Sequence, residues 1–66
     1  MKISLNNTPR DITPNTTLRQ LLTNENLPQQ NIAIAVNNRI VLREAWDSTL
    51  LAENDKVVII AATYGG

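Results

Sequence analysis

Several residue types that carry common protein chemistry are absent from this sequence or rare in it. It has no cysteine, which excludes disulfides and thiolate metal sites, and no histidine, which removes the usual acid–base side chain near neutral pH. Six Lys and Arg balance six Asp and Glu, so no net charge attracts the chain to nucleic acid or anionic membranes. The only aromatic residues, Trp46 and Tyr64, make a poor base-stacking surface. A specific protein partner is therefore a better expectation than nucleic acid.

Long apolar segments are missing as well. No stretch approaches the roughly 20 apolar residues of a membrane helix, and the first residues lack the apolar core of a signal peptide. We therefore expect a cytoplasmic protein that does not enter a membrane. The acidic residues form no identifiable acid–base pair and the chain has no histidine, so we do not expect an enzyme. We also expect no bound metal or cofactor. At 66 residues the chain should form one domain with a small core.

Glycine is used most unevenly, because the two glycines of the chain, Gly65 and Gly66, both stand at its end. Without Cβ, a Gly-Gly end sweeps little volume and can enter a narrow tunnel with its carboxylate first. Together with Thr63 and Tyr64 it gives an extended reach of about 13 Å. We expect residues 63–66 to be a flexible tail that enters a partner's active site, where Gly66 reacts. A frayed terminus without a role is the alternative.

The first half of the chain predicts a hairpin and then a helix. Ile3 and Leu5 alternate with polar residues, as in a strand, and Asn6-Asn7 suits a turn because asparagine tolerates positive φ. A second strand is expected at residues 10–13, and Pro9, which lacks an N–H, would suit an edge position.

A capping-box pattern marks the start of the predicted helix. Thr17 and Gln20 have the spacing of reciprocal N-terminal hydrogen bonds, so the helix should begin near Thr17, and Pro28 should end it. The apolar stripe that would face the core consists of Leu18, Leu21, Leu22 and Leu27.

The second half predicts another hairpin, from residues 32–36 to residues 39–42, with Asn37-Asn38 between them. The segment that follows is expected to be a loop or a short irregular strand. Trp46 should cover an edge of the core with its indole N–H bonded locally, whereas Arg43 as a partner contact is the alternative.

The apolar run at residues 57–62 has no polar face, so it should be the central strand, beside the first strand and under the helix. Leu50-Leu51 should return to the core before it, and residues 53–55 should form a turn. The expected architecture is α+β: a β-grasp domain over residues 1–62, with a mixed sheet and one main helix on one face, followed by the tail.

The outward face of this sheet should carry an apolar patch beside the tail. Val57 and Ile59 would point to the helix, and the residues that alternate with them would point away from it. Such a smooth surface is typical of protein contacts, although a few exposed apolar residues are normal on any sheet. The predicted docking patch consists of Ala33, Ala35, Val58, Ile60 and Ala62.

In their order and spacing, four segments resemble the ThiS family, the sulfur carriers of thiamine biosynthesis. They are residues 35–41, Arg43 with Trp46, residues 53–57 and the terminal Gly-Gly. The resemblance spans the chain and implies a ubiquitin-like β-grasp. The sequence departs from the family at turns, where Asn38 and Asn54 replace the usual glycine.

The resemblance also implies a mechanism. A ThiF-like enzyme would use ATP with magnesium to adenylate Gly66, and sulfur from a donor such as a cysteine desulfurase persulfide would convert it to a thiocarboxylate. A ThiG-like thiazole synthase would then take the sulfur into the thiazole ring. The chain would be a carrier and co-substrate, without a cofactor of its own.

Three alternatives remain open at this stage. A sulfur carrier for molybdopterin synthesis and a ubiquitin-like modifier of lysines would share the tail chemistry. The more distant alternative is a β-grasp binding module whose terminus is inert.

Overall fold

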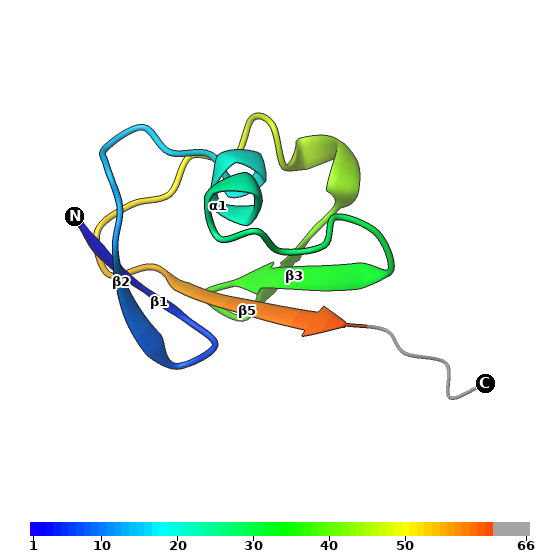
Figure 1. Cartoon of the computed structure of the whole chain (residues 1–66), viewed down its shortest axis with the longest axis horizontal. Coiled ribbons are helices and arrows are strands. Elements are labelled where there is room, and N and C mark those ends of the chain that lie inside the picture. Colours follow the sequence, from blue (N-terminus) through cyan, green and yellow to red (C-terminus); the bar gives the residue numbers. More distant parts are fainter. Residues whose placement is uncertain (62–66) are drawn as a thin grey trace.

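The computed structural model describes residues 1–61, which form a five-stranded sheet with α1 across one face (Figure 1). The elements are β1 (Lys2–Leu5), β2 (Thr8–Asp11), α1 (Leu18–Asn24), β3 (Ile32–Val36), β4 (Arg39–Val41), the 3-10 helix η1 (Arg43–Ala45) and β5 (Lys56–Ala61). The strand order is β2-β1-β5-β3-β4, and β5 runs parallel to β1 and antiparallel to β3. The predicted β-grasp, with the last strand at its centre, is confirmed. The predicted domain boundary after residue 62 lies outside the described residues and stays a prediction.

The first hairpin has the predicted turn, but its second strand lies earlier than residues 10–13. Asn6 and Asn7 have φ values of 50° and 68°, and this two-residue turn pairs Leu5 with Thr8. The strand can pass through Pro9 because β2 is an edge strand, where a missing N–H removes no ladder bond. The turn geometry, rather than the apolar pattern, therefore sets where β2 begins.

Helix α1 begins at the predicted capping box. The hydroxyl of Thr17 accepts a hydrogen bond from the Gln20 backbone N–H (3.1 Å), and the Gln20 side chain accepts one from the Thr17 N–H (3.0 Å). Both bonds satisfy N–H groups that the first turn of a helix leaves free.

The end of α1 falls at Asn24, well before the predicted stop at Pro28. Asn26 turns into the left-handed region with a φ of 55°, and the Leu27 N–H donates to the Leu22 carbonyl (2.9 Å), as in a Schellman motif. Asparagine in the position usually held by glycine therefore ends the helix before proline can. Leu27 still packs, half buried, against the core.

The core lies between α1 and the inner face of the sheet. Its buried members are Ile3, Leu5, Leu18, Leu21, Leu22, Ile34, Trp46, Leu51 and Val57. The prediction that Leu50-Leu51 returns to the core is right for Leu51 but wrong for Leu50, whose side chain is 58% exposed. Leu50 forms an isolated antiparallel bridge with Thr17, and adjacent residues of an extended segment point to opposite sides.

Trp46 closes one edge of the core, as predicted, but the segment before it is the short helix η1 rather than a loop or strand. Its side chain is 2% exposed, and its indole N–H donates to the Val41 carbonyl (3.0 Å). The guanidinium carbons of Arg19 and Arg43 lie 5.3 and 5.6 Å from the centre of the ring. Cation–π contact with two arginines thus adds to the packing of this one tryptophan.

Asparagine holds every left-handed backbone position that is found in residues 1–61. Eight of the nine asparagines of the sequence have a positive φ: Asn6, Asn7, Asn15, Asn26, Asn31, Asn37, Asn38 and Asn54. Asparagine reaches this region more easily than other residues with a Cβ. The described domain therefore builds its turns without glycine.

Candidate functional site

The outward faces of β3 and β5 bring together the described members of the predicted docking patch. The strand register sets Ala33 opposite Ile60 and Ala35 opposite Val58. Ile60 is 59% exposed and Ala33 is exposed, whereas Ala35 and Val58 are partly covered by their neighbours. The predicted positions are therefore confirmed for these four residues, and a docking role for them stays a prediction. Ala62, the fifth member, lies outside the described residues.

Strand β4 adds Ile40 to this surface, a residue outside the predicted docking patch. Ile40 lies opposite Ala35 and is 66% exposed, so Ile40, Ala35 and Val58 form one row across three strands. The signal for it was present in the sequence, because a two-residue turn at Asn37-Asn38 fixes which residue faces Ala35. We call Ala33, Ala35, Ile40, Val58 and Ile60 the outer patch.

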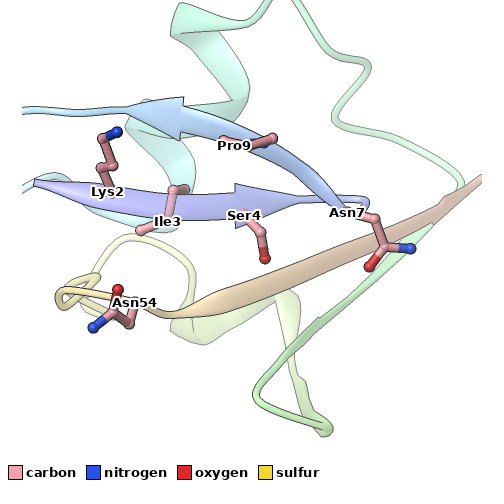
Figure 2. A pocket seen from close by; sticks show the side chains of 6 residues that line it. All are labelled: Lys2, Ile3, Ser4, Asn7, Pro9 and Asn54. Carbon is pink, nitrogen blue, oxygen red and sulfur yellow. The ribbon is translucent and has the colours of Figure 1, made fainter.

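The same face of the sheet becomes polar toward β1 and β2. A shallow hollow of about 200 Å³ lies here, and Figure 2 shows the side chains that line it: Lys2, Ile3, Ser4, Asn7, Pro9 and Asn54. Ser4 lies opposite Lys56, so a second lysine stands at the start of β5 on this side. The outward face is thus apolar near the end of β5 and polar near its beginning.

Within residues 1–61, no group of three or more His, Cys, Asp and Glu residues is placed to hold a metal ion. Several carboxylates instead form ion pairs or hydrogen bonds within the described domain. Glu25 pairs with Arg10 (3.2 Å) near the end of α1, and Asp47 pairs with Arg19 (3.0 Å). Asp55 accepts a hydrogen bond from the Ala52 N–H (2.7 Å) in the turn before β5.

In the same described part of the chain, no helix is long and apolar enough to cross a membrane.

The predicted tail, Thr63, Tyr64, Gly65 and Gly66, lies outside the described residues. The last described residue, Ala61, ends β5 opposite Ile32, and the chain continues from there to the tail. In Figure 1 this end of β5 extends away from the β1–β2 hairpin. The outer patch therefore borders the last described residues before the terminal segment.

A model of the ThiS family matches residues 3–66 of the chain. Two solved structures are similar over the whole chain at 23% sequence identity. One is the crystal structure of the thiamine biosynthesis protein ThiS from Geobacter metallireducens, with a TM-score of 0.87 and full coverage of both chains. The other is the solution structure of a thiamine biosynthesis protein from the same organism, with a TM-score of 0.79 and 88% of that chain covered. No curated protein matches the sequence. The structural likeness confirms the ubiquitin-like β-grasp.

Proposed function

The chain belongs to the ThiS family, and from this membership we propose that it is a sulfur carrier protein of thiamine biosynthesis. The family match over residues 3–66 is the observation that carries the proposal. Solved structures of the same fold come from proteins named for thiamine biosynthesis, which supports the pathway. The chain is then a co-substrate of partner enzymes in the cytoplasm and performs no catalysis of its own.

The reacting group in this proposal is the carboxylate of Gly66. A carboxylate is a poor electrophile, so a ThiF-like partner first activates it with ATP and magnesium. A carboxylate oxygen attacks the α-phosphorus of ATP, pyrophosphate leaves, and an acyl adenylate forms. The partner's magnesium neutralises the charge that develops on the phosphates.

Sulfur then enters by a second displacement. The terminal sulfur of a persulfide, of the kind that a cysteine desulfurase supplies, attacks the activated carbonyl carbon, and AMP leaves. The carbonyl carbon of Gly66 is now bonded to this sulfur, which is still joined to the donor by the S–S bond of the former persulfide. A thiol cleaves this bond, becomes part of a new disulfide and frees the thiocarboxylate. Because the chain has no cysteine, that thiol belongs to a partner or to a small reductant.

The thiocarboxylate is a stronger nucleophile than the carboxylate, and its sulfur passes to the thiazole ring in a ThiG-like synthase. The outer patch would dock the carrier on its partners, since exposed apolar residues next to the outgoing chain suit a protein contact. Thr63, Tyr64 and Gly65 would form the segment that enters the partner's tunnel.

A genetic test separates this destination of the sulfur from its alternatives. In a strain that lacks its own carrier and requires thiazole, the full chain should restore growth without thiazole. The matched control ends at Gly65, keeps the whole described domain and should fail. Rescue of molybdopterin synthesis instead of thiazole synthesis would favour the molybdopterin carrier, and lysine conjugates would favour the ubiquitin-like modifier. Equal rescue by the control would show that the terminus is inert.

A further inference from the structure

Each of the two Asn-Asn turns directs the side chain of its first asparagine at the central strand β5. Asn6 and Asn37 have nearly the same backbone conformation, with φ values of 50° and 51°. They lie in different hairpins, and the strands of those hairpins flank β5 on its two sides. The two asparagines therefore hold the same strand from opposite sides.

Asn37 fixes the beginning of β5. Its backbone N–H donates to the Lys56 carbonyl (2.8 Å), and its side-chain oxygen accepts from the Lys56 N–H (2.9 Å). Its side-chain amide also donates to the Asp55 carboxylate (2.9 Å). A continued antiparallel pair would use the main-chain carbonyl of residue 37, and the side chain takes its place.

Asn6 does the same in the middle of β5, across 53 residues of sequence. Its backbone N–H donates to the Val57 carbonyl (2.9 Å), and the Ile59 N–H donates to its side-chain oxygen (2.7 Å). Its side-chain amide donates in turn to the Ile59 carbonyl (3.3 Å). The β1–β5 pairing itself ends at Leu5 opposite Val57. The Asn6 amide thus adds one more step to the parallel ladder after β1 has turned away.

The turn conformation alone does not require these bonds. The second residues of the turns, Asn7 and Asn38, have φ values of 68° and 69°. Their side chains make no hydrogen bond to another residue in the range 1–61, in contrast to Asn6 and Asn37. A positive φ alone therefore does not account for the hydrogen bonds of the Asn6 amide.

The contact with Asn6 lies where β5 loses one of its two neighbours. Beyond Ile59, β5 continues to Ala61 beside β3, while in the described chain β1 has already ended (Figure 1). Ile59 also stands between Val58 and Ile60, two members of the outer patch. Beyond this point β3 alone pairs with β5 among the described residues, so the bond at Ile59 is the last contact that holds β5 on its β1 side, next to that patch.

We propose that Asn6 is a positioning residue, whose amide aligns the end of β5 so that a docked carrier presents its C-terminus to the active site of the adenylating enzyme. The proposal rests on the sulfur-carrier function proposed above. Productive geometry in a bound complex affects the rate of reaction more than the affinity, because the misaligned complex still forms but reacts slowly.

The test measures kcat and KM for adenylation of the carrier by a ThiF-like enzyme with ATP and magnesium. Asn6→Gly removes the amide while allowing the same positive φ, and Asn7→Gly is the matched control in the same turn. We expect Asn6→Gly to lower kcat about tenfold, with KM within about twofold of wild type. Asn7→Gly should leave both constants unchanged. Faster hydrogen exchange of the Ile59 N–H in Asn6→Gly alone would confirm that the bond was lost.

A second variant covers the case in which Asn6→Gly does not fold. Asn6→Asp keeps an oxygen acceptor for the Ile59 N–H, but it replaces the donor to the Ile59 carbonyl with a negatively charged oxygen, so kcat should fall about threefold. A kcat equal to wild type in Asn6→Gly, or in Asn6→Asp if Asn6→Gly does not fold, overturns the positioning role. A rise in KM alone overturns it too, because Asn6 would then act in docking. If wild type is not adenylated at all, the proposed function fails, and this inference fails with it.

Discussion

The two faces of β5 carry the same kind of residue in opposite surroundings. Val57 is fully buried against α1, whereas Ile60, on the outward face, is 59% exposed. In residues 1–61 a single α-helix, α1, packs on the sheet, and a chain of 66 residues has only enough material to cover one side of it. The inner face therefore stabilises the fold, and the branched apolar residues of the outer face are available to a partner. Hydrophobicity identifies β5 as central, but only the alternation along it separates the buried side chains from the exposed ones.

The largest effect is expected on the inner face. Ile34→Ala should reduce the free energy of unfolding by about 2–5 kcal/mol, because the removed atoms leave a cavity beneath α1. A domain of this size has about 3–10 kcal/mol in total, so the variant should be partly unfolded at 37 °C. Urea denaturation followed by Trp46 fluorescence gives the value. A loss below about 1 kcal/mol would mean that the inner face does not hold the fold as described.

A substitution on the outer face should weaken binding to a partner and leave the stability of the fold nearly unchanged. Ile60→Asp places a charge in the outer patch and should weaken binding to the adenylating enzyme by about 2 kcal/mol, roughly thirtyfold in Kd. Its free energy of unfolding should stay within about 0.5 kcal/mol of wild type. Calorimetric titration measures the first and urea denaturation the second. Ser4→Asp, on the polar part of the same face, is the control and should bind normally. Equal effects of the two variants would contradict a localised docking patch.

The turn between β3 and β4 sets the register of these two strands, and a substitution in it should have a smaller effect on stability. Asn38 has a φ of 69°, so Asn38→Ala should lose about 1 kcal/mol of unfolding free energy, because alanine disfavours the left-handed region. Asn38→Gly tolerates this φ and should lie within about 0.5 kcal/mol of wild type. Thermal unfolding of the pair checks the prediction. If both variants lose the same amount, the Asn38 side chain rather than its backbone conformation is responsible.

The smallest effect should come from the edge of the outer patch. Ile40→Ser removes an exposed side chain on β4 and should change the free energy of unfolding by less than about 0.5 kcal/mol. It should weaken docking by only about twofold to threefold, because residues at the rim of an interface contribute little. The same titration used for Ile60→Asp measures it. A loss of affinity as large as that of Ile60→Asp would mean that the centre of the docking surface lies on β4 and not on β5.

Local patterns in the sequence predicted much of this fold. The capping box at Thr17 and the two Asn-Asn turns depend on residues within a few positions of each other, so their chemistry can be read directly. The lack of a polar face on the last strand identified it as central. From these elements the sheet and its outward face followed.

The errors arose where distant contacts or an unexpected residue decided the structure. Asn26 ends α1 before Pro28 because asparagine replaces glycine at the left-handed cap. Leu50 turns outward because it pairs with Thr17, which periodicity does not reveal. The hydrogen bonds between the Asn6 amide and Ile59 link residues 53 positions apart, so no local sequence pattern predicts them. The outer patch was found only in part, since Ile40 required the register of the β3–β4 turn.

The most direct test of the carrier function is the intact mass of the chain after incubation with a ThiF-like enzyme, ATP with magnesium and a persulfide sulfur donor. We predict a species heavier by the difference between a sulfur and an oxygen atom, with the added mass located at Gly66 by fragmentation. Its formation should require ATP and should not occur with a chain that ends at Gly65. An unchanged carboxylate at Gly66, with an adenylating enzyme and donor that modify another ThiS protein, would contradict the carrier function.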